Sequence, residues 1–490
     1  MSLSESPFRC CLLGPLFSLG SALIFPSYWF LDRFLSVVVV TSVERSQGVA
    51  VRIVCLLGAP LFLLLFAISL PLAVMGLLLW VPLHQVRRPF CYQRSSSSRV
   101  YTGAKVHGPR TFTIISANLC LLPDGLARFS NLGHTQWRSD LIAQLLVAPQ
   151  EPAKNKTGDA DAASVCSAED VLTVVESVAE EETGPSGDGG FPGQVAVTFP
   201  PDADFLCLQE VFDGRASRRL RHVLASSFPH VLYDVGPAGP YNCGFRFFNS
   251  GLFLASRHPP VAAKYYCYPN ARGEDALAAK GLLCVKVLVG VSEEKQRIVG
   301  YINCTHLHAP EEDADIRCDQ MTLLLQWISE FQSQNSEGEI VAFDVLCGDL
   351  NFDNCSPDDC LEQKHELFSV YTDPCRGRAG QERRGTVGTL LRQELLYHEA
   401  VKTPENLRRT LLSDGERKTY VAAPLPQDVD EDEPWWTGRR IDYILYRKSL
   451  SVLPAVVEKF QFVTQLAGLS DHIPISLHIS VTVPSLPHCE

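Results

Sequence analysis

The heptapeptide CGDLNFD at residues 347–353 is the stretch from which the fold of this chain can be inferred. It follows the apolar run IVAFDVL at 340–346, which is typical of a buried strand. Side chains alternate between the two faces of a strand, so Asp349 and Asn351 point the same way. A carboxylate beside a carboxamide at a strand end suits a hard cation, or a phosphate held beside one. For this stretch alone a simple turn is an equal alternative, because turns favour the same residue types.

Three more polar clusters lie at the ends of apolar runs. Ser116–Asn118 ends one run, Gln209–Val211 ends a second, and Ser470–His472 opens a third. In this order the clusters resemble the exonuclease–endonuclease–phosphatase superfamily, whose fold is that of deoxyribonuclease I, over roughly residues 110–482. The resemblance implies an α+β fold, a four-layer α/β/β/α sandwich, which is preceded here by an N-terminal membrane-inserted helical region.

Hydrophobic periodicity predicts the elements of such a sandwich. Amphipathic helices are predicted over 137–146 and 315–331. Two packed sheets with helices on their outer faces accommodate the order of the elements. Strands are predicted at 228–235, 251–256, 280–289, 297–306, 440–446 and 456–463.

The first 86 residues are predicted to form a membrane region with two hydrophobic segments. No charged residue occurs at about 10–31 or at 53–86, and roughly 20 apolar residues are enough to span a bilayer. Prolines interrupt both segments, so hairpins that enter one leaflet are as compatible with the sequence as complete spans. If the first segment were a cleaved signal peptide, the second would still hold the chain in the membrane. The apolar segments also offer a packing surface for a homo-oligomer.

A basic juxtamembrane linker is predicted at 87–110, where Arg and Lys occur without Asp or Glu. Positive charge beside a membrane segment favours the cytosolic side and attracts anionic headgroups at about 1 kcal/mol per residue. A solvated linker is the alternative. The residues expected to bind anionic lipid are Arg87, Arg88, Arg94 and Arg99, and the candidates for reversible acylation such as palmitoylation are Cys10, Cys11 and Cys91.

The catalytic domain is predicted to extend over 111–482, with a mobile acidic insertion at about 147–194 and a C-terminal tail at 483–490. The formal net charge of −12 is concentrated in acidic loops, and it gives little support for nucleic-acid binding. The 17 cysteines include no CxxC pair. An odd number in a large chain is typical of reduced thiols in a cytosol-facing enzyme.

The polar groups at the strand ends indicate a reaction class. The sequence contains no nucleophilic serine elbow, Walker loop or zinc-type His/Cys spacing. Carboxylates, carboxamides and histidines are instead typical of metal-assisted hydrolysis of a phosphodiester. We expect Glu210 to bind Mg²⁺ directly, with Asn118 close beside it.

His472 is the strongest candidate for the general base, because histidine accepts a proton near neutral pH. The superfamily resemblance implies that Asp442, in the motif RIDY, orients this histidine. Asp471 either shares that role or faces the metal. A buried structural His–Asp pair is the alternative.

Three further residues are expected to act on the water or the phosphate. Asp349 would orient the attacking water or the base, while Asn351 and His306 would donate hydrogen bonds to the phosphate oxygens as negative charge builds up. His306 is chosen because it matches the Thr-His-Leu histidine of the superfamily, and His308, which shares its strand face, is a lesser candidate.

The segment RGEDALAAKGLL at 272–283 looks like the segment of membrane-bound neutral sphingomyelinases in which an Asp and a Lys five residues apart gate the active site. Here these residues are Asp275 and Lys280. An exposed ion pair on a helix face, worth little energetically, is the alternative. With the apolar N-terminus, this segment makes the chain similar to the vertebrate neutral sphingomyelin phosphodiesterases over nearly its whole length, and its short insertion is most similar to that of the mitochondria-associated branch.

The resemblance implies hydrolysis of sphingomyelin to ceramide and phosphocholine with Mg²⁺, for which Mn²⁺ is a substitute, and stimulation by anionic phospholipids such as phosphatidylserine. It implies a membrane location, with a cytosol-facing catalytic domain on mitochondrial or endoplasmic reticulum membranes. A membrane-tethered nuclease or an inositol-phosphate phosphatase is the alternative within the superfamily, and no nucleic-acid partner is expected. A catalytically inert membrane scaffold is a further alternative, although none of the expected catalytic residues is missing.

Overall fold

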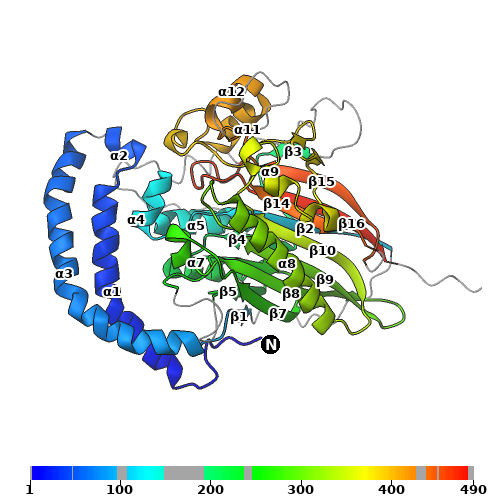
Figure 1. Ribbon diagram of the computed structural model, residues 1–490, viewed down its shortest axis with the longest axis horizontal. Helices are drawn as coiled ribbons and strands as arrows, with labels where there is room; N and C mark the ends of the chain where they lie inside the picture. The colour runs from blue at the N-terminus through cyan, green and yellow to red at the C-terminus, as the bar shows by residue number, and fades with distance from the viewer. Residues whose placement is uncertain are drawn as a thin grey trace, which may run out of the picture.

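The computed structural model describes residues 3–46, 48–95, 108–147, 193–236, 246–425, 438–449 and 452–483. Within them, a helical hairpin from the N-terminal residues lies beside a unit built from strands and helices (Figure 1). Arg99, nearly all of the predicted acidic insertion and the tail from residue 484 onward lie outside the described residues.

One sheet of the globular unit has eight strands in the order β1-β5-β6-β4-β2-β16-β15-β3. The central strands β2 and β4 run parallel, so Asn118 lies opposite Gln209 at their carboxyl ends. The edge strand β1, which pairs with β5, comes from residues that the sequence predicted to be linker. The eight strands are β1 (Cys91–Arg94), β2 (Gly108–Asn118), β3 (Gly193–Ala196), β4 (Phe205–Gln209), β5 (His230–Tyr233), β6 (Phe253–Ser256), β15 (Ala455–Val463) and β16 (Ile475–Val483).

The second sheet has six strands in the order β11-β14-β10-β9-β8-β7. β9 and β10 run parallel, which places His306 opposite Asp349. β14 runs antiparallel to β10 on its other side and places Asp442 opposite the same Asp349. The six strands are β7 (Pro260–Cys267), β8 (Gly281–Val291), β9 (Arg297–His306), β10 (Ile340–Asp349), β11 (Tyr371–Thr372) and β14 (Asp442–Arg447).

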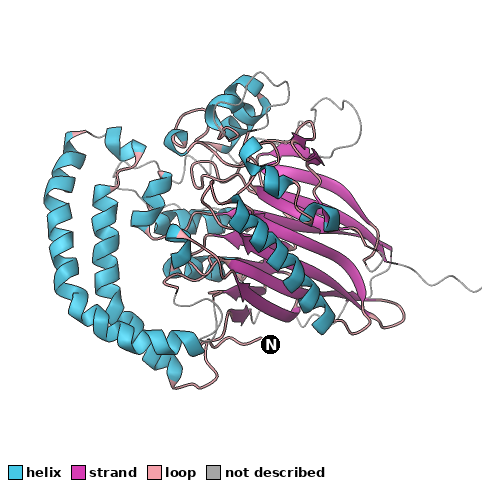
Figure 2. Ribbon diagram, viewed as in Figure 1, coloured by secondary structure: helices cyan, strands magenta, loops and turns pink. Residues whose placement is uncertain are grey.

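Helices cover the outer faces of the two sheets, and the strands form the centre of the unit (Figure 2). Ile142 and Leu220, from α5 and α7, pack against the eight-stranded sheet, and Leu324 of α8 packs against the six-stranded sheet. A third apolar cluster, which includes Phe343, fills the space between the sheets. These four layers confirm the predicted α/β/β/α sandwich. The covering helices are α5 (Thr135–Leu146), α7 (Gly214–Leu224) and α8 (Ala314–Gln334).

Most predicted strands and both predicted helices are found within a few residues of their expected positions. The sequence analysis missed α7, whose apolar positions are separated by arginines, and the short elements of the loop regions. These are α4 (Asp124–Ala127), η1 (Arg128–Ser130), η3 (Gly273–Leu277), η4 (Pro357–Asp359), α9 (Cys360–Gln363), α10 (Leu367–Val370), β12 (Arg376–Arg378), β13 (Gln381–Glu382), η5 (Gln393–Leu395), α11 (Pro404–Leu412) and α12 (Asp414–Tyr420).

The N-terminal residues form α1 (Leu13–Val38), the short α2 (Ser42–Ser46) and α3 (Val49–Val86). α1 and α3 lie side by side, and α3 is visibly curved (Figure 1). The expectation that proline would break these segments is wrong, since Pro26 lies inside α1 and three prolines lie inside α3. Proline in a helix interior bends or breaks the helix, and here α3 bends without ending.

The two apolar segments differ in their capacity to cross a membrane. Among the described helices, only residues 53–86 are long and apolar enough for a span, with a mean hydropathy of 2.7. The first segment was also expected to be long and apolar enough for a span, but glycine, serine and proline among its apolar residues lower its hydropathy. Large apolar side chains of α3 such as Leu56 and Leu78, each 75% exposed, face outward from the protein.

The hairpin is attached to the globular unit at both of its ends. At the α2 end, Arg128 forms two hydrogen bonds to Glu44, of which Nη2 to Oε1 is 2.8 Å. At the other end, just after α3, Arg87 Nη2 donates to Asp234 Oδ2 at 2.7 Å. The hairpin therefore lies along the globular unit instead of projecting away from it.

Close backbone contact joins the hairpin to α4 between these two ends. The amide of Gly125 donates to Asp32 Oδ1 of α1 at 2.8 Å. A Cβ atom at Gly125 would lie 2.6 Å from the Cβ of Leu35. Glycine at this position is therefore required for the observed distance between α1 and α4.

Candidate active site

Polar side chains from both sheets converge at one edge of the sandwich. Asn118 ends β2, Glu210 follows β4, and His306 and Asp349 end β9 and β10. Because these pairs of strands are parallel, their carboxyl ends meet at the same edge. Asp442 reaches that edge as the first residue of the antiparallel strand β14. The four strand-end clusters noted in the sequence are thus brought together.

Asn118 links the two carboxylates of the site. Its Nδ2 donates to Glu210 Oε1 and to Asp349 Oδ2, both at 3.0 Å. Its Oδ1 accepts a hydrogen bond from the amide of Cys120, which fixes the orientation of the carboxamide. Glu210 and Asn351 both have positive φ, at 59° and 55°, a conformation that non-glycine residues adopt at some energetic cost and that clusters at functional sites.

Burial perturbs both carboxylates. It raises the pKa of Glu210 to about 7, and the negative charge of Asp471 adds to that shift. Burial also raises the pKa of Asp349 to about 6, although the neighbouring His472 opposes the shift. Two carboxyl groups that resist ionisation in the protein alone are well placed to be ionised by a bound cation.

His472 is held by a carboxylate on one side and faces the site with its other nitrogen. Its Nδ1 lies 2.9 Å from Asp442 Oδ2, and its Nε2 lies 3.8 Å from Asp349 Oδ2. Burial alone would lower the pKa of His472, but Asp442 and Asp349 raise it well above the usual value. Asp471 instead accepts a hydrogen bond from Gln393 at 3.0 Å. Asp442, and not Asp471, is therefore the carboxylate hydrogen-bonded to the histidine ring.

His306, the last residue of β9, and His308, two positions beyond it, have different surroundings. His306 is buried, with Nε2 3.6 Å from Asp349 Oδ2 and 4.0 Å from Glu210 Oε1. Burial, together with the charge of Lys280, lowers the pKa of His306 well below the usual value, so its ring is neutral. His308 lies between two other carboxylates, those of Asp275 and Asp313, at 3.2 and 2.8 Å. His306 thus belongs to the site, and His308 does not touch its carboxylates.

The Asp275–Lys280 pair is buried beside the site, so the alternative of an exposed ion pair on a helix face is wrong. Lys280 Nζ donates to Asp275 Oδ2 at 2.9 Å and to the carbonyl of Leu307 at 3.0 Å. The same carbonyl accepts a hydrogen bond from Asn351 Nδ2 at 3.0 Å. Burial opposes ionisation of Asp275, but Lys280 outweighs it and lowers the pKa of this carboxyl well below its usual value. The pair is therefore connected to the site through Leu307.

The donor atoms of the site fit a hard divalent cation. One nitrogen or oxygen each from Glu210, His306 and Asp349 lie within 4.8 Å of one another. Atoms of Asp349, Asp442 and His472 form a second such group. Mg²⁺ and Mn²⁺ prefer oxygen ligands, which the carboxylates of Glu210 and Asp349 supply.

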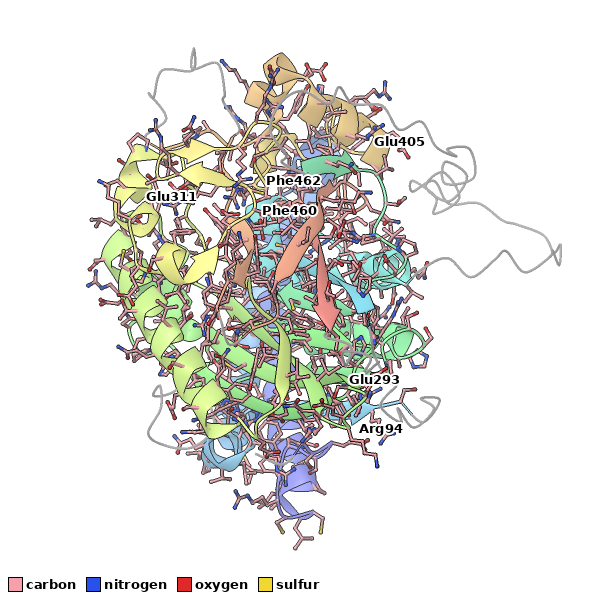
Figure 3. All side chains as sticks on the ribbon, turned by 90° about the vertical axis from the view of Figure 1, so that its right-hand side faces the viewer. Arg94, Glu293, Glu311, Glu405, Phe460 and Phe462 are labelled. Atoms are coloured by element: carbon pink, nitrogen blue, oxygen red, sulfur yellow. The ribbon has the colours of Figure 1, made fainter. Side chains whose placement is uncertain are left out.

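The arginines expected to bind anionic lipid are not equivalent. Arg87 is buried and its guanidinium is bound to Asp234, and Arg99 lies outside the described residues. Arg88 is half-buried, and Arg94 is exposed. In Figure 3, Arg94 lies at the opposite end of the view from Glu311, which forms an ion pair with Arg439 near the site. Any effect of Arg94 on catalysis would therefore act over a distance.

Arg439 and Gln393 are site-supporting residues that the sequence analysis did not identify. Arg439 forms ion pairs with Asp353 at 3.5 Å and with Asp359 at 3.7 Å, both in the loop after Asp349. Gln393 holds Asp471, which is 78 positions away in the sequence. No local pattern marks such residues, because their partners are distant in the chain.

Cys267 is disulfide-bonded, which is an exception to the prediction that the thiols are reduced.

Comparison with known proteins gives two family matches. Residues 12–86 match the family described as neutral sphingomyelinase N-terminal transmembrane region, and residues 162–472 match the endonuclease/exonuclease/phosphatase family. Sphingomyelin phosphodiesterase 5 of Danio rerio is 44% identical over 99% of this chain and 99% of its own length. The Mus musculus protein of the same name is 42% identical over 98% and 95%, and sphingomyelin phosphodiesterase 3 of Homo sapiens is 34% identical over 98% and 99%.

Proposed function

The chain belongs to the sphingomyelin phosphodiesterase family, with a catalytic domain of the endonuclease/exonuclease/phosphatase type. From this membership we propose that it is a neutral sphingomyelinase, which hydrolyses sphingomyelin to ceramide and phosphocholine with Mg²⁺. The observation that carries the proposal is the convergence of Glu210, Asp349 and the His472–Asp442 pair at one edge of the sandwich, beside a buried Asp275–Lys280 pair.

In this proposal His472 is the general base. Donation from Nδ1 to Asp442 leaves Nε2 of the neutral ring to take a proton from the attacking water, and the neighbouring carboxylates that raise the pKa of His472 make it a stronger base. Asp349, whose carboxylate lies 3.8 Å from that nitrogen, helps to hold the water in line with the phosphorus. The ring of His306, neutral because it is buried, donates to a phosphate oxygen as negative charge builds up. The second N–H of the Asn351 carboxamide is available for the same purpose.

Glu210 would hold the cation, and Asn118 beside it donates from Nδ2 to both Glu210 and Asp349 and so fixes the two carboxylates. When bound, Mg²⁺ supplies charge stabilisation for the phosphate and for the leaving alkoxide. Lys280 is proposed to contribute a second positive charge beside the phosphate, in the position that Asp275 fixes. Mn²⁺ is expected to replace Mg²⁺, because the donor set suits both ions.

The N-terminal hairpin is proposed to lie in one leaflet of the membrane. Both of its ends contact the same globular unit, through Arg128–Glu44 and Arg87–Asp234. A helix that crossed the bilayer would carry its two ends to opposite sides. Insertion from one side instead accounts for the exposed apolar side chains of α3 and keeps the site close to its lipid substrate.

We also propose that anionic phospholipids stimulate the enzyme through Arg88, Arg94 and Arg99, and that the catalytic domain faces the cytosol on mitochondrial or endoplasmic reticulum membranes. Arg87 is committed to Asp234, so its substitution should weaken the hairpin attachment instead of the lipid contact. Replacing the other three arginines by glutamine should abolish stimulation by phosphatidylserine while leaving the unstimulated rate unchanged. Stimulation that survives this replacement would contradict the proposal, and protease protection of intact organelles tests the orientation.

The activity is tested by phosphocholine release from sphingomyelin vesicles with Mg²⁺. We expect release by the wild-type chain, its loss with a chelator or with His472→Ala, and its retention with His222→Ala, which removes an exposed histidine of α7. DNA and inositol phosphates are offered in parallel. Hydrolysis of either, without release of phosphocholine, would assign the chain to another activity of the superfamily.

A further inference from the structure

Three cysteine side chains meet between the two sheets, just below the candidate active site. Cys207 belongs to β4, and Cys304 and Cys347 lie opposite each other on β9 and β10. One Sγ atom from each lies within 4.8 Å of the other two. All three side chains are fully buried, and none forms a disulfide. We call this group the thiol cluster.

A buried cysteine ordinarily packs as a small apolar side chain, but the surroundings of the thiol cluster are polar. Gln209 is fully buried, and its Nε2 donates to Cys304 Sγ at 3.5 Å and to Ser116 Oγ at 3.3 Å. Within the described residues, the Oε1 atom of Gln209 accepts no hydrogen bond. Burial of an unpaired carbonyl oxygen is unfavourable, so this amide needs a partner that the apolar core does not supply.

The geometry of the thiol cluster suits a soft metal ion. Zinc–sulfur bonds are about 2.3 Å long, which places three sulfurs around one ion roughly 4 Å apart. The upper limit of 4.8 Å for the sulfurs of the thiol cluster is compatible with that spacing. Mg²⁺ and Ca²⁺ prefer oxygen ligands and would not bind here. Thiolates select Zn²⁺ and Cu⁺ instead, and Gln209, whose Nε2 lies 3.5 Å from Cys304 Sγ, borders the cluster.

We propose that the thiol cluster is a structural site for a thiophilic ion, of which Zn²⁺ is the common representative. Binding would form three Zn–S bonds and release the three thiol protons to water, without any change of oxidation state. The ion would enter while the chain folds, before the two sheets close over the cysteines, as is usual when metal binding is coupled to folding.

The position of the cluster gives the ion a structural effect on the site. Cys304 and Cys347 each precede a site residue, His306 and Asp349, by two positions, and Cys207 precedes Glu210 by three. The ion would therefore connect β4 of one sheet to β9 and β10 of the other, close to the carboxyl ends of these strands where the site residues lie. The inference is independent of the substrate proposed above.

The test is the zinc content of the full-length chain, produced in zinc-supplemented medium and purified in detergent without a chelator. We expect about one zinc ion per chain, and a sulfur shell near 2.3 Å in its X-ray absorption spectrum. Cys304→Ala should lower the zinc content to background. The matched control is Cys284→Ala, which removes an equally buried thiol from β8, outside the cluster, and should retain the zinc.

Two further outcomes separate this site from the catalytic one. Glu210→Gln should retain the zinc, because Glu210 belongs to the catalytic site alone; loss of zinc from this variant would place the ion in the active site and overturn the inference. If Cys304→Ala fails to fold, the X-ray absorption spectrum of the wild-type chain still tests whether the zinc is bound by sulfur. A shell without sulfur, or a zinc content far below one per chain, would show that the three thiols are only apolar packing.

Discussion

The catalytic edge of the sandwich and the seam between hairpin and sandwich are held together in different ways. At the catalytic edge, fully buried polar side chains from strands of both sheets contact one another within hydrogen-bonding distance. At the seam, a few partly exposed ion pairs stand at the ends of the hairpin, with one close backbone contact between them. The geometry of the site therefore depends on the core, whereas attachment of the hairpin depends on a small number of separable contacts.

The largest effect expected at the catalytic edge is that of Asp442→Asn. The carboxamide preserves the shape of the side chain but removes the charge that fixes the His472 tautomer, so kcat should fall about 10²–10⁴-fold while thermal stability changes little. Asp471→Asn is the matched control, because Asp471 contacts Gln393 instead of the histidine ring. The activity and the stability of both variants are measured by phosphocholine release and by thermal unfolding. Equal losses of activity would show that Asp471 shares the orienting role.

The second prediction concerns the cation. A ligand that binds only the folded protein stabilises it by about 2.7 kcal/mol at a concentration 100 times its Kd. Mg²⁺ should therefore raise the unfolding temperature of the wild-type chain, and a chelator should reverse the rise. In Glu210→Gln the neutral side chain should abolish this response. An undiminished magnesium shift in that variant would place the cation elsewhere, for example at the group formed by Asp349, Asp442 and His472.

The third prediction concerns the seam. Gly125→Ala places a methyl group 2.6 Å from Leu35 Cβ and 2.7 Å from the carbonyl oxygen of Asp32, and such overpacking costs roughly 1–3 kcal/mol. The hairpin should separate from α4, as seen by faster hydrogen exchange in both. The control is Gly14→Ala in α1, where an added Cβ meets nothing within 4 Å. If the two regions are separable, Gly125→Ala will leave hydrolysis of a soluble substrate analogue unchanged. A large loss of that activity would show that the seam also positions the site.

The contrast between the two regions explains what could be predicted from the sequence. Asp349 and Asn351 were recognisable because a local pattern, an apolar strand ending in polar residues, positions them. The same reasoning found Asn118, Glu210 and His472. Local patterns are silent on contacts across the fold, such as Arg87 with Asp234, which are 147 positions apart.

The burial of the Asp275–Lys280 pair and the continuity of α3 could not be predicted from the sequence for the same reason. The buried ammonium group of Lys280 is satisfied by the carbonyl of Leu307, which lies 27 positions away in the sequence. Proline positions in α3 suggested breaks, but packing along α1 keeps the helix continuous. In both cases tertiary contacts determine an outcome that local residue preferences alone would misjudge.

The smallest effect is expected from pH at the α2 end of the hairpin. Partial burial opposes ionisation of Glu44, but its hydrogen bonds from Arg128 outweigh this and lower its pKa. Asp124, which also contacts Arg128, has a lowered pKa after the same competition between burial and hydrogen bonding. A lowered carboxyl pKa stabilises the folded form above the ordinary carboxyl range, and this contribution is lost as the pH falls below about 4.

Acid should therefore loosen the α2 end of the seam, by roughly 1 kcal/mol because the Glu44 side chain is still 25% exposed. Hydrogen exchange of α2 and η1 should rise as the pH is lowered from 6 to 3, after correction for the intrinsic exchange rate. Glu44→Gln should show the raised exchange already at pH 6 and a weaker pH response. Since Arg128 is almost fully buried and Asp124 remains beside it, the variant should keep the guanidinium in place. An unchanged pH response in Glu44→Gln would assign the titration to Asp124 and the adjoining contact between α1 and α4.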